Sequence, residues 1–145
     1  MNEDRHIPRF VSIVAILLGT LDLVRGFMHT ILLEYAALTI AGLDLSTPLA
    51  GDLLQLLGTF GISNYVTGVM LILLGWKARP LALTMLGVLP LAYGLGIVGI
   101  RLNTTGYPSS AAAWGGAPMM LGYLMVCGII FVVETVVAQR SKQRA

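Results

Sequence analysis

The stretch GISNYVTGVMLILLGWKARPLALTMLGVLPLAY, from Gly61 to Tyr93, consists of two apolar segments joined by a short basic turn. The turn contains Lys77 and Arg79, and Pro80 follows where the first turn of a helix accepts proline well. A helix needs about 20 apolar residues to cross a bilayer, because its backbone groups must be satisfied within the segment. The stretch therefore predicts two membrane-spanning helices that run in opposite directions.

The composition of the whole chain extends this prediction. Of the 145 residues, 57% are hydrophobic and 11% are charged, and the mean hydropathy is +0.85. Soluble domains carry roughly 25% charged residues, and a small soluble domain has much surface to cover. We therefore predict an all-α polytopic membrane protein, a single domain over 1–145 that forms a four-transmembrane-helix up-down bundle. Its spans are expected at about 10–30, 53–76, 80–100 and 118–137.

Three features near these spans refine the prediction. Between Ile31 and Leu43 the chain stays apolar but contains Glu34, which indicates an extension of the first helix or a short interfacial segment outside the membrane core. Pro90 lies inside the third span and predicts a kink. The basic flank before the first span mimics a signal peptide, but no small-residue cleavage site follows it, so we expect an uncleaved first span.

Most basic residues fall on one side of this topology. The loops of the opposite side hold Arg101 together with Asp44 and Asp52. Because Lys and Arg concentrate in cytoplasmic segments, the distribution predicts an N-in, C-in orientation. The basic residues on the predicted inner side are Arg5, Arg9, Lys77, Arg79, Arg140, Lys142 and Arg144.

Three polar residues interrupt the first span at helical spacing. Asp22 and Arg25 are three residues apart and His29 follows Arg25 by four, so the three side chains form one stripe on a helix. Each charge costs roughly 2.5–3.5 kcal/mol near the centre of a span, and pairing Asp22 with Arg25 offsets part of this cost. We therefore expect the stripe to face the bundle interior.

The other spans carry polar residues at similar depth. A rise of about 1.5 Å per residue places Asn64 near the midplane and Tyr93 and Tyr123 in the outer half, close to the depth of the stripe. This coincidence predicts a polar pocket that opens outward, with all six residues as ligand-binding or proton-relay candidates. The competing interpretation is structural, because polar side chains also join helices by hydrogen bonds worth about 0.6 kcal/mol on average.

Glu134 lies near the inner end of the fourth span and is expected to pair with Lys77 or Arg79.

Other motifs point to packing rather than to chemistry. Gly94, Gly96 and Gly99 formally match a dinucleotide fingerprint, but no strand precedes them, so we expect them to let neighbouring helices approach closely. Gly58, Gly61 and Gly68 are expected to act in the same way in the second span. The single cysteine, Cys127, excludes an internal disulfide, and no metal-ligand spacing or nucleic-acid-binding pattern is present. No metal site is therefore predicted, and haem is disfavoured because His29 is the one histidine within a span.

The layout of the chain resembles the DoxX-like group of small four-span membrane proteins of bacteria and archaea. The resemblance is carried by Gly61–Tyr93, with its Leu-Leu-Gly end and short basic turn, and to a lesser extent by Arg25–Gly26 and Leu38–Ser46. It implies a prokaryotic plasma membrane and a link to membrane oxidoreductase assemblies, with a quinone as the cofactor. It transfers no catalytic residue to this sequence.

Three functions follow from these observations. The first is an accessory or binding subunit with an outward-opening polar pocket, embedded in the lipid bilayer of the cell membrane as a multi-pass protein. The second is a quinone-linked oxidoreductase subunit, and the third is a small carrier or permease. A partner membrane protein or a homo-oligomer fits each of them, whereas the catalytic residues, the substrate and the existence of an enzymatic activity stay open.

Overall fold

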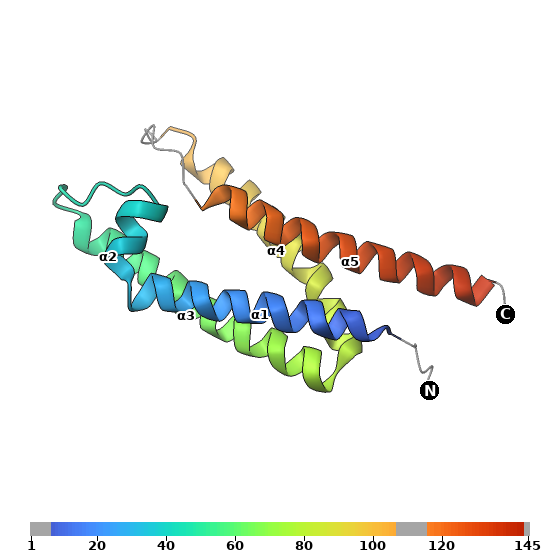
Figure 1. The fold of residues 1–145 in the computed structure, drawn as a ribbon. Coiled ribbons are helices and arrows are strands. Elements are labelled where there is room, and N and C mark those ends of the chain that lie inside the picture. The colour runs from blue at the N-terminus through green and yellow to red at the C-terminus, as the bar shows by residue number, and fades with distance from the viewer. Residues whose placement is uncertain (1–6, 107–115, 144–145) are drawn as a thin grey trace.

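The computed structural model describes residues 7–106 and 116–143 and contains helices without any strand in those ranges. The predicted all-α class is therefore confirmed. Four long helices run roughly along one axis, and the two shorter helical segments lie together at one end (Figure 1). The elements are α1 Arg9–Thr30, α2 Leu33–Tyr35, the π-helical η1 Ala36–Ile40, α3 Ala50–Lys77, α4 Arg79–Thr104 and α5 Ala117–Gln143.

The four long helices correspond to the four predicted spans. Each is long and apolar enough to cross a membrane, so the chain is built as a small multi-pass membrane protein. The helices extend past the predicted bounds, most of all in α4 and α5. At a rise of about 1.5 Å per residue they exceed the roughly 30 Å hydrocarbon core, and their ends reach the headgroup region.

The connection between α3 and α4 is as short as the sequence indicates. Ala78 alone separates the two helices, and its N–H donates to Leu74 O over 2.8 Å. Pro80 stands in the first turn of α4, where its missing N–H costs no helical hydrogen bond. The helix also continues through Pro90, which lies inside α4.

A seam of small residues holds α1 against α3. A Cβ built on Gly19 would lie 2.6 Å from Gly68 O, and one built on Gly68 would lie 2.7 Å from Gly19 O. The seam repeats every seven residues in both directions, so the two backbones touch along much of their length. The facing pairs are Gly26 with Gly61, Gly19 with Gly68, and Ser12 with Gly75.

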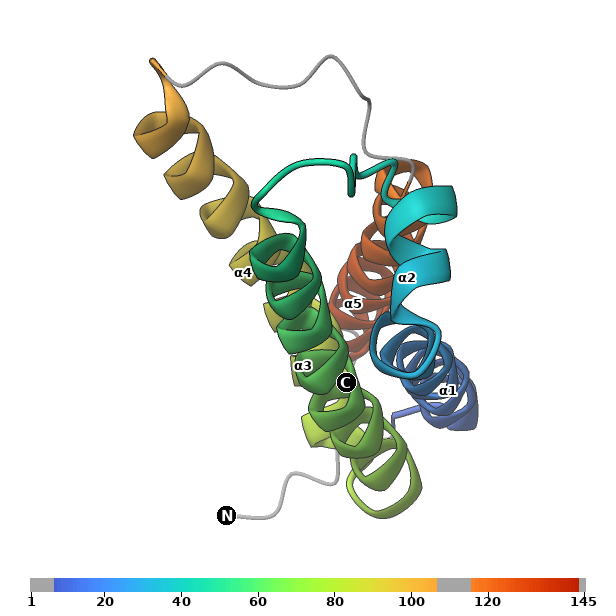
Figure 2. The same ribbon diagram turned by 90° about the vertical axis from the view of Figure 1, so that its left-hand side faces the viewer.

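The glycines of α4 do not serve the packing role predicted for them. A Cβ at Gly94, Gly96 or Gly99 would meet no atom of the described residues within 4 Å. Figure 2 shows the second half of α4 lying away from α3 and α5, which leaves these glycines without a neighbouring helix. Among the glycines predicted for the second span, Gly61 and Gly68 do allow close approach, whereas Gly58 makes ordinary contacts of 3.8 Å or more.

The segment after α1 forms a separate short helical unit rather than an extension of the first helix. Ile31 and Leu32 make a turn, both donating their N–H groups to Phe27 O, and α2 and η1 then follow. Gly42 ends the unit with a φ of 65°, a left-handed conformation that glycine adopts without a steric penalty. The unit lies at the end of the bundle where α1 ends and α3 begins (Figure 2).

The closely packed core lies toward the opposite end. It joins the first half of α1 to the second half of α3 and to the facing parts of α4 and α5. Its buried residues include Val11, Leu18, Leu71, Leu83, Leu86, Leu89, Tyr123 and Cys127.

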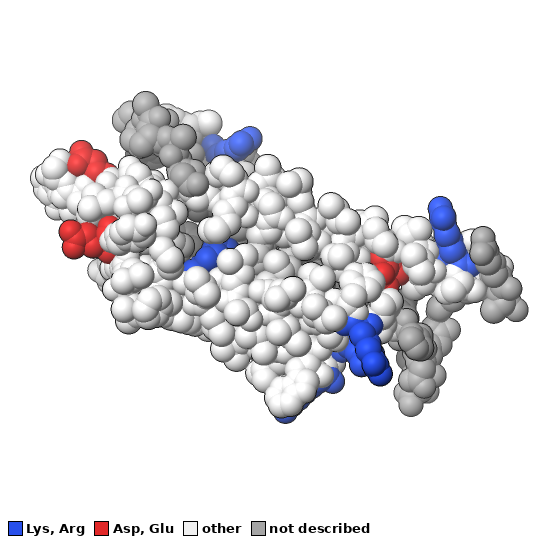
Figure 3. Space-filling model, in the orientation of Figure 1, with Lys and Arg blue, Asp and Glu red and all other residues white. Residues whose placement is uncertain are grey.

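Charged side chains gather at the two ends of the molecule, and its sides are largely uncharged (Figure 3). Glu34, Asp44 and Asp52 lie at the end that carries α2, together with Arg101 on α4. The described basic residues Arg9, Lys77, Arg79 and Arg140 lie toward the other end. Arg5 and Arg144, which the sequence places on the same side, lie outside the described residues.

Candidate functional site

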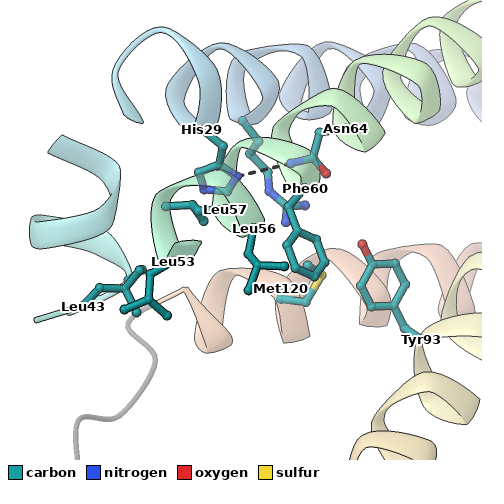
Figure 4. Close-up of a pocket in the computed structure, with 11 residues that line it drawn as sticks. His29, Leu43, Leu53, Leu56, Leu57, Phe60, Asn64, Tyr93 and Met120 are labelled. Atoms are coloured by element: carbon teal, nitrogen blue, oxygen red, sulfur yellow. Dashed lines mark hydrogen bonds between the residues drawn. The ribbon is translucent and has the colours of Figure 1, made fainter. Parts of the chain in front are cut away.

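A cavity of about 260 Å³ lies beneath the α2–η1 unit, at the end of the bundle where the long helices separate. Every long helix contributes to its wall, and so does the loop after η1 (Figure 4). Its volume is just below the range of roughly 300–1,000 Å³ that is usual for small-molecule sites. The lining residues are Arg25, His29, Ala41, Leu43, Leu53, Leu56, Leu57, Phe60, Asn64, Tyr93 and Met120.

Four of the six candidate residues from the sequence line this cavity, namely Arg25, His29, Asn64 and Tyr93. Asn64 is buried, and its Nδ2 lies 3.4 Å from His29 Nδ1 across the α1–α3 seam. With the amide nitrogen as donor, Nδ1 of the imidazole is the acceptor and the ring proton lies on Nε2. Figure 4 shows the Tyr93 hydroxyl directed toward the same space from α4.

The other two candidates, Asp22 and Tyr123, do not line the cavity but hold Arg25 in place. Arg25 Nη1 donates to Asp22 Oδ1 over 3.2 Å, and Tyr123 Oη donates to Asp22 Oδ2 over 2.7 Å. The guanidinium carbon lies 5.9 Å from the centroid of the Tyr123 ring, within the range of a cation–π contact. The pairing of Asp22 with Arg25 is thus present, and the stripe faces the protein interior as predicted.

Arg25 has hydrogen-bonding capacity that the described residues do not use. The residue is 8% exposed, and its Nε is buried without any acceptor in the described part of the chain. The bond from Nη1 to Asp22 is the one hydrogen bond that its side chain makes to these residues. A buried donor without a partner costs about 1–3 kcal/mol, and this nitrogen is enclosed by protein rather than open to the cavity.

The larger part of the cavity wall is apolar, which the sequence interpretation of a polar pocket did not foresee. Leu53, Leu56, Leu57 and Phe60 follow the i, i+3, i+4, i+7 spacing of one helix face. Asn64 continues the same face of α3 one turn later. The sequence alone shows this spacing. In a span that is apolar on every face, however, the spacing does not indicate whether these side chains face a cavity or lipid.

The apolar wall reaches the outer surface of the bundle. Leu56 is 62% and Phe60 is 64% exposed, although both line the cavity. In a bilayer such side chains would contact lipid tails. The cavity is therefore bordered by lipid-facing residues along α3, and its polar residues lie deeper.

Two other polar residues within the spans, Glu134 and Tyr65, lie outside the cavity wall. Glu134 is buried on α5 but makes no ion pair with Lys77 or Arg79, which corrects the pairing inferred from the sequence. Tyr65 Oη lies 3.0 Å from Thr30 Oγ1 and links α3 to α1, a contact that sequence reasoning missed.

Arg25, His29, Asn64 and Tyr93 can each donate a hydrogen bond to a molecule in the cavity. Within the described ranges, no group of three or more His, Cys, Asp and Glu residues could hold a metal ion. Comparison of the chain with protein-family models, with curated proteins and with solved structures gives no match. The resemblance to the DoxX-like group stays a prediction.

Proposed function

We propose that this protein is a membrane-embedded binding subunit that holds a small amphipathic molecule in the cavity beneath the α2–η1 unit. One observation supports this most directly: Arg25, His29, Asn64 and Tyr93 come from three helices and meet in one cavity with an otherwise mostly apolar wall. Apolar pockets with a few convergent polar groups are the usual form of small-molecule sites.

The structural interpretation of the same residues explains only part of the arrangement. Helix-joining hydrogen bonds account for Asp22, Tyr123 and the contact between His29 and Asn64. They do not account for the unpaired Nε of Arg25 or for the cavity that Arg25 helps to line. A ligand-binding role for these residues therefore fits the observations better than a role in joining helices alone.

The charge distribution supports the orientation that goes with this function. With the basic end of the bundle in the cytoplasm, both termini would lie inside and the cavity would lie in the outer half of the cell membrane. A ligand would then enter from the outer leaflet or from the outside. A prokaryotic plasma membrane is the setting that the layout of the chain suggests.

A quinone-linked oxidoreductase subunit is the second candidate. The observation in its favour is that hydrogen-bond donors border an apolar cavity, as ring carbonyls and an isoprenoid tail would require. In that case Arg25, His29 or Tyr93 would bind the quinone oxygens.

The test of the proposed function is a binding experiment with a cavity-filling variant. Native mass spectrometry of the protein in an uncharged detergent would be titrated with ten-carbon amphiphiles: decanoate, methyl decanoate, decanol and a decyl-substituted quinone. At least one should form a one-to-one complex that Leu57→Trp abolishes. Leu95→Trp is the matched control, because Leu95 is 76% exposed and lies outside the cavity. If no amphiphile binds, or if Leu57→Trp binds as well as the wild type, the proposed function is wrong.

A further inference from the structure

We infer that the cavity selects an amphiphile with a carboxylate head and a single apolar tail. This inference rests on the proposed function and specifies the chemical class of the ligand. It is derived from the type of polar group that borders the cavity, the charge of one of these side chains, and the position of the apolar wall.

The polar groups bordering the cavity offer donors for a bound head group. Arg25 supplies N–H groups, His29 supplies Nε2–H when Asn64 donates to its Nδ1, and Tyr93 supplies a hydroxyl. No Asp or Glu is among the lining residues. Both oxygens of the nearby Asp22 already accept hydrogen bonds, one from Arg25 and one from Tyr123. A head that accepts hydrogen bonds is therefore favoured over an amine or another cation.

The charge of Arg25 favours an anionic head. Its Nη1 is bound to Asp22, its Nε is enclosed by protein, and no described residue accepts a hydrogen bond from Nη2. A carboxylate accepts hydrogen bonds on both oxygens, and its bond to a guanidinium is charge-assisted and therefore stronger than that of a neutral acceptor. Asp22 and the Tyr123 ring already hold the guanidinium in place.

The apolar wall accounts for the tail. Leu53, Leu56 and Leu57 extend the cavity along α3, and Leu56 is largely exposed at the bundle surface. A tail lying along this wall would pass from the deep polar groups to the lipid-facing side. The small volume accommodates the head and the first part of a chain, and the remainder of the tail would lie in the bilayer.

The deciding measurement compares decanoate with methyl decanoate in the native mass spectrometry titration, at alkaline pH where the acid is ionised. The two molecules share one tail, but the ester carries no charge that could pair with Arg25. Decanoate should bind at least roughly tenfold more tightly, the ratio expected for one charge-assisted hydrogen bond. Equal affinity, or tighter binding of the ester or of the decyl quinone, would overturn the carboxylate assignment while leaving the proposed function intact.

Two variants assign the selectivity to Arg25. Arg25→Lys keeps the charge beside Asp22 but replaces the two terminal guanidinium nitrogens by a single ammonium, and Asp22→Asn with Arg25→Gln removes both charges together. In each, the ratio of the two dissociation constants should fall toward one, whereas the Leu95→Trp control should keep the wild-type ratio. A wild-type ratio retained in both variants would contradict the role of Arg25. If neither variant accumulates, the wild-type ratio decides the inference by itself.

Discussion

The hydroxyl of Tyr123 donates a 2.7 Å hydrogen bond to Asp22 Oδ2 and thereby connects α5 to α1 across 101 positions of sequence. Both residues are buried, at 5% and 2% exposure. The same carboxylate accepts the bond from Arg25, so Tyr123 helps to fix the orientation of the guanidinium. Helix α5 is therefore coupled to the cavity through Tyr123, although Tyr123 does not line the cavity.

Tyr123→Phe should destabilise the protein by about 1–3 kcal/mol, because it leaves one oxygen of a buried carboxylate without its donor. Unfolding in a mixed-micelle denaturant titration would measure the change. Tyr35→Phe is the matched control, since Tyr35 is 56% exposed and its hydroxyl has no hydrogen-bond partner among the described residues. An equal effect of the two substitutions would contradict this account of Tyr123.

Asp22→Asn should cost about 3–5 kcal/mol of stability, because it leaves the Arg25 charge buried without its partner. Adding Arg25→Gln should recover part of this loss by removing the charge. A double-mutant cycle on thermal unfolding gives the coupling free energy of the pair. Strictly additive effects would show that the two side chains do not stabilise each other.

Gly68→Ala should destabilise the bundle by about 1–3 kcal/mol, since the new Cβ would lie 2.7 Å from the Gly19 carbonyl oxygen and α1 would have to move. Gly96→Ala is the matched control, because it makes the same substitution where the new Cβ would lie more than 4 Å from every atom of the other described elements. It should be neutral or stabilise the helix by up to about 1 kcal/mol. Thermal unfolding of both variants measures the contrast, and a loss on Gly96→Ala would indicate that a partner packs against α4.

The loop after η1 should loosen at low pH. Ser46 donates its hydroxyl at 2.6 Å and its N–H at 2.9 Å to Asp44 Oδ1, and these bonds hold the pKa of Asp44 below its ordinary value of 3.8. A lowered folded pKa contributes stability that is complete above the unfolded pKa and is lost as pH falls through the folded pKa. An NMR titration of the Asp44 carboxyl carbon measures this value directly. Ser46→Ala should raise the pKa toward 3.8, and an unchanged titration curve would show that the loop contact is not formed.

The orientation of the bundle can be tested with reporters fused to the C-terminus. The basic end predicts that a fluorescent protein matures there, whereas alkaline phosphatase, which needs an oxidising compartment, stays inactive. A phosphatase inserted at Asp44 should be active, because the loop after η1 belongs to the opposite end. The reverse pattern at both positions would place the cavity on the cytoplasmic side.

Much of the fold could be predicted because the signals are local. A span is recognised from about 20 consecutive apolar residues, whatever they contact, and the turn at Ala78 follows from its basic residues and Pro80. The spacing of Asp22, Arg25 and His29 likewise places them on one helix face before any neighbour is known. The neighbour of each residue was not predictable in this way. Gly68 contacts α1, whereas Gly96 faces no other element of the described chain, although both are glycines within apolar helices.

The sequence by itself determined that four helices are long and apolar enough to cross a membrane and that one of them carries a charged stripe on a single face, because hydrophobic length and helical period are properties of a single segment. Only the tertiary structure decided that Arg25, His29, Asn64 and Tyr93 border one cavity, and that leucines of α3 form its wall. The physical reason is that lipid tails and a protein interior are almost equally apolar. Apolar residues in a span therefore do not indicate which face meets lipid, another helix or a cavity until the helices are packed together.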